Sequence, residues 1–326
     1  MSAAPRPRRS AHPTTLAALL SAAARRLARA GVSFGHGTTN ARDEAAWLIQ
    51  HALGMPVGAL DAAALRRPVA AADAQRALAL IDERVARRVP AAYLIGEAWL
   101  RGRRFRVDAR VIVPRSFLAE LLDARLAPWL AAPARVRRVL DLCTGSGCLA
   151  ILAAQAFPRA QVDAVDLSSA ALEVAAENVA AYRLGRRIEL LQGNLFAPVH
   201  GRQYDLILSN PPYVPAAAMR RLPAEYRREP TLALAGGEDG FALVEPLLRA
   251  AARHLTPDGL LVVEIGHYRR QFAAAYPHLA CVWPPTSGGD DCVFAVTRDA
   301  LQARGALSRR PAPRRARRES AASPRR

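Results

Sequence analysis

The chain has 326 residues, of which 51% are hydrophobic, and its formal net charge is +18. This length suits two domains, and the hydrophobic share supplies a substantial core, which excludes a wholly disordered protein. No stretch approaches the roughly 20 apolar residues that a membrane span needs, so we expect a cytoplasmic protein with no membrane contact.

The positive charge is concentrated at the two ends of the chain. All 46 basic residues are Arg, with Arg6, Arg8 and Arg9 near the start and nine Arg beside one Glu in residues 304–326. Both ends are rich in Pro, Ala and Ser and cannot bury enough surface to offset the entropy of ordering. We therefore expect a disordered basic arm over residues 1–12 and a disordered Arg-rich tail over 304–326. These segments are either solvated tails or salt-sensitive tethers to RNA.

The first folded part of the chain has the spacing of helices. One apolar face runs from Leu16 to Leu27, and helical spacing recurs over Ala41–Leu53 and Ala71–Val89, after which Pro90 ends the set. This pattern predicts a small helical domain over residues 13–91.

A strand-like alternation follows and leads into a longer α/β pattern. Residues 92–114 alternate between polar and apolar, with Gly96 and Gly102 as turn points, which predicts a β-hairpin that links two domains. Residues 115–303 then alternate strands with helices. This alternation predicts a doubly wound, mostly parallel, Rossmann-like sheet with helices on both faces.

The core of the second domain begins with a strand, a glycine loop and a helix. Val136–Leu142 is a buried strand, residues 143–147 are the loop, and Cys148–Phe157 is a helix. The next strand, Gln161–Asp166, ends in a carboxylate about 20 residues after the glycines, where doubly wound folds bind a ribose. The loop also satisfies the dinucleotide fingerprint, so a nicotinamide enzyme competes with other nucleoside-cofactor enzymes. Asp141 favours a cofactor with a cationic methionyl group.

The segment Asn210-Pro211-Pro212-Tyr213 closes the apolar run Tyr204–Leu208. An amide or exocyclic amino nitrogen is a poor nucleophile, because it shares its lone pair with a neighbouring π-system. The Asn210 side-chain oxygen and the Pro211 carbonyl can each accept one N–H of such a group and orient its lone pair. Pro212 holds Pro211 extended before the substrate arrives, and Tyr213 can stack on the planar group. The alternative is that the two prolines only end a buried strand.

The rest of the domain supplies the remaining strands and helices. The pattern predicts helices over Phe241–Leu255 and Tyr268–Ala275, and strands over Gly259–Ile265, Leu279–Trp283 and Cys292–Thr297. Cofactor and substrate are expected to meet at the carboxyl ends of the parallel strands, where both main motifs fall.

The Cys and His residues show none of the spacings typical of a nucleophile or a metal site. The four Cys form no C-x-x-C pair, and the seven His form no H-x-x-x-H motif. We therefore expect no metal and no covalent intermediate.

The motif order gives a family resemblance over about residues 40–300. The segments DLCTGSGC, VDAVDLS, NPPYV, EYRREP and LALAGGEDGF resemble the HemK-like class I methyltransferases, which use S-adenosyl-L-methionine to methylate the side-chain amide of a protein glutamine. The family has one branch that acts on peptide-chain release factors and one that acts on large-subunit ribosomal protein L three. VIVPRSFLAELL, Cys143 and SGGDDCVF are similar to the ribosomal-protein branch.

The resemblance implies a role for each matching position. It places Asp141, Thr144, Gly145 and Gly147 at the methionine end of the cofactor, Asp166 at the ribose, Asn194 and Leu195 beside the adenine, and Asn210, Pro211, Pro212 and Tyr213 at the glutamine amide. Asn210 also faces the cofactor. The family usually has Asp where this chain has Asn194, although an amide oxygen can still accept the adenine amino proton.

The resemblance also implies partners. The helical domain would recognise the protein substrate, and the Arg-rich ends would contact ribosomal RNA weakly. Three other functions stay open: amino methylation of a nucleic-acid base, a non-catalytic ribosome-assembly role, and nicotinamide oxidoreduction. The residues alone do not fix the modified glutamine, the branch or the oligomeric state.

Overall fold

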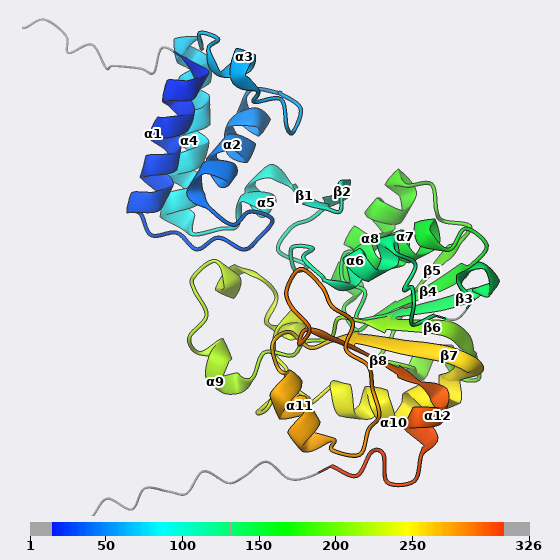
Figure 1. Cartoon of the computed structure of the whole chain (residues 1–326). Coiled ribbons are helices and arrows are strands. Elements are labelled where there is room, and N and C mark those ends of the chain that lie inside the picture. The colour runs from blue at the N-terminus through cyan, green and yellow to red at the C-terminus, as the bar shows by residue number, and fades with distance from the viewer. Residues whose placement is uncertain (1–14, 131, 310–326) are drawn as a thin grey trace, which may run out of the picture.

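The computed structural model describes residues 15–130 and 132–309 (Figure 1). The basic arm predicted over residues 1–12 lies outside the described residues, as does the part of the predicted tail from 310 onward. None of the helices in the described ranges combines the length and apolarity that a membrane crossing requires.

The start of the predicted tail is folded, so the expectation of disorder is wrong for residues 304–309. Ala306 is buried, and the Arg309 guanidinium pairs with the carboxylates of Asp239 and Glu245. Charge-assisted hydrogen bonds to these two carboxylates hold the guanidinium on the folded body, and they do not depend on the composition of the surrounding sequence.

The N-terminal part is a bundle of helices around one apolar core (Figure 1). Three of its helices begin at side-chain caps: Thr15 accepts a hydrogen bond from the Ala18 N–H, Asn40 accepts from the N–H groups of Arg42 and Asp43, and Asp61 accepts from the Ala64 N–H. Three helices closely match the predicted segments: α1 Leu16–Arg29, α2 Ala41–Ala52 and α4 Ala71–Arg87. The short helix α3, Ala62–Leu65, was not predicted.

The hairpin that joins the two parts is shorter than the predicted 92–114. The short helix α5, Ala91–Ile95, occupies its start and ends at Gly96, whose φ is +81°. The antiparallel strands follow as β1 Glu97–Leu100 and β2 Arg103–Arg106. Arg101 and Gly102 between them both have positive φ, at 50° and 72°, which is the backbone of a tight two-residue hairpin turn.

The second part is built on one six-stranded sheet in the order β5-β4-β3-β6-β7-β8. All neighbouring pairs are parallel except β7 and β8. The predicted α/β class with a mostly parallel sheet is confirmed. The strands are β3 Arg138–Leu142, β4 Gln161–Asp166, β5 Ile188–Gln192, β6 Tyr204–Ser209, β7 Leu255–Glu264 and β8 Val293–Thr297.

One predicted strand is wrong. Residues 279–283 contribute only an isolated bridge, in which Val282 exchanges backbone hydrogen bonds with Ala295. Pro284 and Pro285 follow at once and have no N–H to donate, so the pairing cannot extend into a ladder.

Helices cover both faces of the sheet (Figure 1). One apolar cluster packs β3 against α6 and α7, and a second packs the other face against α10, α11 and α12. The helices of this part are α6 Leu118–Asp123, α7 Cys148–Ala156, α8 Ser169–Ala181, α9 Ala216–Met219, α10 Val244–His254, α11 Arg269–Ala275 and α12 Arg298–Gln302.

The strand register brings the two main motifs to one edge of the sheet. Leu142 at the end of β3 is level with Val165 of β4 and with Ser209 of β6. The glycine loop, Asp166 and Asn210 follow directly on these three positions. The ends of β3 and β6, at Leu142 and Ser209, are 67 positions apart along the chain, yet they meet where parallel sheets bind their ligands.

The helical bundle and the sheet domain share an apolar contact. The core of the bundle continues through Val107, Val111 and Val113 to Ala171 and Val174 on α8, all of them buried. The apolar core of the bundle is therefore continuous, through the segment after the hairpin, with a helix that starts beside the glycine loop.

Candidate active site

The glycine loop between β3 and α7 has a backbone that depends on its glycines. Gly145 has a φ of +55° and Gly147 a φ of +76°, both in the region that favours glycine. The Gly145 N–H donates to Asp166 Oδ2 at 2.8 Å, and a Cβ on Gly147 would lie 3.1 Å from the Cβ of Ala175. The loop therefore wraps closely around the end of β4, and Asp166 is fixed by it.

Asp141 lies beneath this loop and is completely buried. Its Oδ2 accepts a hydrogen bond from the Thr144 hydroxyl at 2.5 Å, whereas Oδ1 has no partner among the described residues. Burial raises the pKa of this carboxyl to about 7, although the Thr144 bond lowers it in part. An unpaired buried carboxylate oxygen favours a cationic partner at this point.

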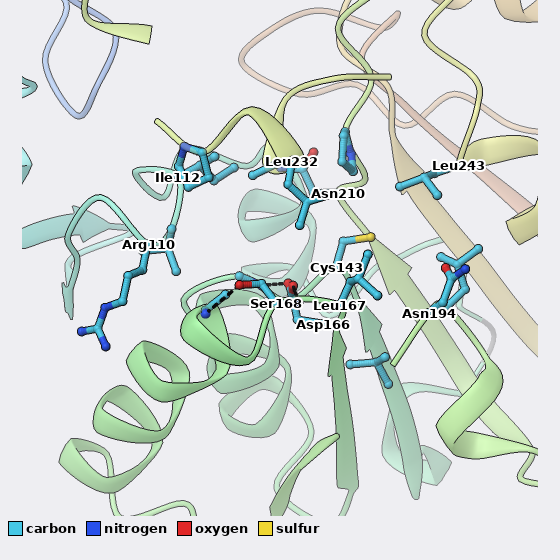
Figure 2. A pocket seen from close by; sticks show the side chains of 18 of the residues that line it. Arg110, Ile112, Cys143, Asp166, Leu167, Ser168, Asn194, Asn210, Leu232 and Leu243 are labelled. Carbon is cyan, nitrogen blue, oxygen red and sulfur yellow. Dashed lines mark hydrogen bonds between the residues drawn. The ribbon is translucent and has the colours of Figure 1, made fainter. Parts of the chain in front are cut away.

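A pocket opens above the loop and contains most of the predicted cofactor residues (Figure 2). Asn210, Leu232 and Ile112 lie on the side opposite Asp166 and Ser168. The predicted site residues in its lining are Gly145, Asp166, Asn194, Leu195, Asn210 and Pro212. Three other predicted residues do not line the pocket: Thr144 and Gly147 belong to the loop itself, and Asp141 bonds to the loop through Thr144.

A second pocket adjoins the first and holds the other predicted residues. It is lined by Ile112, Arg115, Asn210, Pro211, Tyr213, Val214, Leu222, Tyr226, Ala233 and Leu234. Asn210 lines both pockets. No hydrogen bond to another described residue engages the Asn210 side chain or the Pro211 carbonyl. Two acceptors are therefore available where the pockets meet.

Tyr213 is held by the end of β7. Its hydroxyl donates to Glu264 Oε1 at 3.4 Å, and a Cβ on Gly266 would lie 2.8 Å from the ring. Glu264 is itself buried and accepts from the Ser116 hydroxyl at 2.5 Å and from the Phe117 N–H at 2.9 Å. The ring position is thus set by a carboxylate and a glycine that sequence reasoning did not assign to the site.

The loop from Gly236 to Gly240 packs against the same motif. A Cβ on Gly236 would lie 2.7 Å from the Tyr213 backbone, and one on Gly240 would lie 2.6 Å from the Tyr213 carbonyl oxygen. Val214 and Ala235 form a parallel bridge beside this contact. The glycines allow two backbones to lie side by side, so this loop braces the Asn-Pro-Pro-Tyr segment.

A buried carboxylate, Glu229, ties the loop after this motif to the segment before α6. Its Oε1 accepts from the Val113 N–H at 2.9 Å and from Arg115 at 2.6 Å, and its Oε2 accepts from Arg115 at 2.7 Å. His36 Nε2 lies 3.5 Å from Oε2. Burial alone would raise the pKa of Glu229, but His36 and Arg115 outweigh it and lower the pKa to about 2. Glu229 therefore favours the ionised form and holds Arg115 in the second pocket through two hydrogen bonds.

A further buried ion pair joins this loop to the helical bundle. Arg84 on α4 is completely buried and donates to Glu44 at 2.8 Å, to Glu225 at 3.2 Å and to the Ser33 carbonyl at 2.9 Å. Glu225 also pairs with Arg88 at 2.9 Å. The residue after Glu225 is Tyr226, which lines the second pocket, so the bundle helps to position the pocket wall.

The buried Glu264 predicts a pH effect on stability. Burial is the main cause that raises its pKa to about 7, against the hydrogen bonds from Ser116 and Phe117. A carboxyl whose pKa is higher in the folded state stabilises the fold below its unfolded pKa, and this contribution is lost as the pH rises through about 7. From pH 4.5 to 7.5, we expect the parent to lose roughly 1–3 kcal/mol more stability than Glu264→Gln.

Urea unfolding of both proteins at the two pH values measures this difference. Glu238→Gln, at an exposed position, controls for the loss of one carboxylate. Equal pH slopes for the parent and Glu264→Gln would contradict the assignment. Asp141, whose pKa burial also raises to about 7, contributes the slope that remains in the variant.

Comparison with known proteins places these features in a family. Residues 117–223 match the family model of the methyltransferase small domain, and residues 18–96 match that of the PrmC N-terminal domain. The chain is 57% identical to the ribosomal protein uL3 glutamine methyltransferase of Bordetella pertussis, over 88% of this chain and 96% of that protein. The enzymes of the same name from Burkholderia pseudomallei and Neisseria meningitidis serogroup B are each 50% identical. They cover 89% and 88% of this chain, and 96% and 94% of their own lengths.

A methyltransferase from Pyrococcus furiosus is among the solved structures that resemble this chain. It superposes with a TM-score of 0.44 at 18% identity, over 61% of this chain and 90% of that chain.

Proposed function

Because this chain belongs to the ribosomal protein uL3 glutamine methyltransferase family, we propose that it methylates the side-chain amide nitrogen of one glutamine in uL3, the large-subunit protein L three. The methyl donor is S-adenosylmethionine. One observation carries the proposal: the two pockets meet at Asn210, so a nucleoside cofactor in one and an amide in the other would share a boundary.

The residues that line the first pocket fit this cofactor, together with the glycine loop and the buried Asp141 that bonds to it. The unpaired Asp141 Oδ1 suits the ammonium of a methionyl group, with Thr144, Gly145 and Gly147 around it. Asp166 suits the ribose hydroxyls, and Asn194 with Leu195 suits the adenine. The cofactor supplies an electrophilic methyl on a sulfonium centre, and the protein supplies the orientation.

The second pocket fits a glutamine side chain. Asn210 Oδ1 and the Pro211 carbonyl oxygen each accept one amide N–H, which turns the nitrogen toward the first pocket. The Tyr213 ring stacks on the planar amide. Apolar neighbours such as Ile112 and Leu234 keep water away, so these hydrogen bonds act in a low dielectric. The product is a secondary amide, because the amide nitrogen gains the methyl group and loses one proton to solvent.

The experiment compares two protein acceptors. The purified enzyme is incubated with labelled S-adenosylmethionine and either uL3, from ribosomes of a strain that lacks this enzyme, or a peptide-chain release factor, and the label is mapped by mass spectrometry. Label on one uL3 glutamine is the expected result. Label on the release factor would keep the chemistry and change the substrate, and label only on added deproteinised nucleic acid would assign the amino group held by Asn210 to a base.

The Asn at position 194 predicts a small effect on cofactor affinity. Asn194 lines the first pocket and is exposed, and its amide oxygen can accept the same adenine proton as the Asp that the family usually has there. We expect Asn194→Asp to bind S-adenosylmethionine as tightly as the parent or up to several-fold more tightly, as measured by calorimetric titration. Weaker binding by the Asp variant would contradict an adenine contact.

The Arg-rich tail is proposed to contact ribosomal RNA weakly. Four exposed arginines on the folded body, Arg220, Arg221, Arg227 and Arg228, lie in the loop that borders the second pocket and extend this basic character. We expect deletion of residues 310–326 to weaken retention on ribosomal RNA several-fold at low salt, and the difference to shrink as salt rises. This deletion spares the ion pairs of Arg309. Unchanged RNA retention at low salt would contradict the proposal that the tail tethers the protein to RNA.

A further inference from the structure

Three side chains with metal-binding atoms converge where the chain leaves β7 and enters β8. They are His267, Asp291 and Cys292. The spacing of Cys and His along the chain predicted no metal, because His267 and Cys292 lie far apart in sequence. The sheet brings them together, since the N–H of Ile265, just after β7, donates to the Cys292 carbonyl at 2.8 Å.

The three ligand atoms form a compact triangle. Cys292 Sγ lies 3.5 Å from His267 Nδ1 and 3.4 Å from Asp291 Oδ1, and His267 Nδ1 lies 3.1 Å from Asp291 Oδ1. Zinc bonds of about 2.3 Å to sulfur and about 2.0–2.2 Å to nitrogen and oxygen give tetrahedral edges of roughly 3.3–3.6 Å between ligand atoms. The spacing of the three atoms is therefore close to one face of a zinc tetrahedron.

The surrounding loop keeps the three groups in place. Arg269 binds both the side chain and the carbonyl of Asp290, at 3.0 Å and 2.8 Å. This contact engages Asp290 and leaves Asp291 directed at the histidine. The Gly288 carbonyl oxygen lies 3.4 Å from Cys292 Sγ, and it or a water can occupy a fourth position.

We propose that His267, Asp291 and Cys292 form a binding site for a thiophilic divalent metal ion, with Zn²⁺ as the natural occupant. A thiolate and an imidazole beside one carboxylate favour zinc over magnesium or calcium, which take oxygen ligands. The Cys292 thiol loses its proton to solvent as the metal–sulfur bond forms, and the His267 proton moves to Nε2 so that Nδ1 can bind.

The site lies next to the motif proposed to hold the substrate amide. His267 directly follows Gly266, on which the Tyr213 ring packs, and Glu264 accepts from the Tyr213 hydroxyl. A metal at His267 would therefore fix the segment that supports Tyr213. The site is separate from both pockets, and no zinc chemistry enters methyl transfer.

The test uses the full chain after chelator treatment and dialysis, with Co²⁺ as a spectroscopic probe and Zn²⁺ as a competitor. We expect about one equivalent of Co²⁺ to give the visible bands of a tetrahedral ion and a thiolate charge-transfer band in the near ultraviolet, and Zn²⁺ to remove both. Cys292→Ser, which keeps the size of this buried side chain, should lose the charge-transfer band, and His267→Ala should lose at least tenfold in Zn²⁺ affinity by calorimetry.

Two matched variants separate this site from adventitious binding. Cys281→Ser and His278→Ala remove the same residue types outside the cluster, and both should bind like the parent. Circular dichroism confirms that each variant is folded. The proposal is overturned if the parent binds no metal, or if the parent and Cys292→Ser bind equally. These measurements need no methyl transfer, so their outcome does not depend on the proposed function.

Discussion

Asn210→Ala should lower the turnover number for methyl transfer by about 10²–10³-fold or more, because one of the two acceptors that orient the amide is removed. The side chain has no other described hydrogen-bond partner to disrupt, so the fold should be unchanged. Since Asn210 also lines the cofactor pocket, the dissociation constant of S-adenosylmethionine is expected to shift by only a few-fold.

Single-turnover transfer to uL3 and calorimetric titration of the cofactor measure the two quantities separately. The matched control is Ser209→Ala, one residue earlier, where the hydroxyl donates to the Leu142 carbonyl at 3.0 Å and reaches neither pocket. Ser209→Ala should keep most of the activity. If Asn210→Ala turned over at the parental rate, Asn210 would not orient the amide. A cell in which Asn210→Ala fully replaces the parent would indicate a non-catalytic assembly role.

Arg84→Met should lower the free energy of unfolding by about 3–4 kcal/mol, because it removes one partner from a buried ion network. Glu44 would retain only the Thr38 hydroxyl at 3.0 Å, in a site where burial already raises its pKa. The loss of unfolding free energy is expected at the lower end of the usual range for buried ion pairs, since Glu225 still pairs with Arg88. The Michaelis constant for uL3 should also rise, because Tyr226 follows Glu225 in the wall of the second pocket.

Urea unfolding of three variants tests this prediction. Arg26→Met is the control: its pair with Asp82 is 46% and 61% exposed, so its loss should cost at most about 1 kcal/mol. Combining Arg84→Met with Glu44→Gln should recover part of the stability, because Glu225 still pairs with Arg88 and neither buried carboxylate is then left without a cationic partner. An Arg84→Met cost no larger than that of Arg26→Met would show that the network adds nothing to stability.

The two tests report on different parts of the molecule. Asn210 acts on the reacting group and should leave stability unchanged. Arg84 is remote from it and acts through the loop that carries Glu225 and Tyr226. A loss of substrate affinity with unchanged cofactor affinity in Arg84→Met would identify the helical bundle as a support for the substrate pocket.

Local patterns in the sequence were enough to predict most of the strands, the glycine loop and the Asn-Pro-Pro-Tyr segment, although β5 was not predicted and the strand expected over 279–283 was wrong. Strand β4, Gln161–Asp166, has the predicted bounds, and helix α7 differs from its prediction by one residue. Parallel strands end at a common edge, so residues that directly follow β3, β4 and β6 had to meet there. The sequence therefore predicted that Asp166 and Asn210 lie at one edge of the sheet, and the strand order of the structure brings both to one pocket.

The partners of the buried charges were decided only by the tertiary structure. Ser116 and Glu264 are separated by 148 positions, and Arg84 and Glu225 by 141. Carboxylates at such positions look like ordinary surface charges in the sequence, because nothing local shows that they are buried. The same applies to His267 and Cys292, which meet only because β7 and β8 pair. The sequence by itself determined the strand ends and their motifs, since these depend on short-range periodicity. Long-range packing determined which charges are buried and which groups neutralise them, since both depend on atoms contributed by distant segments.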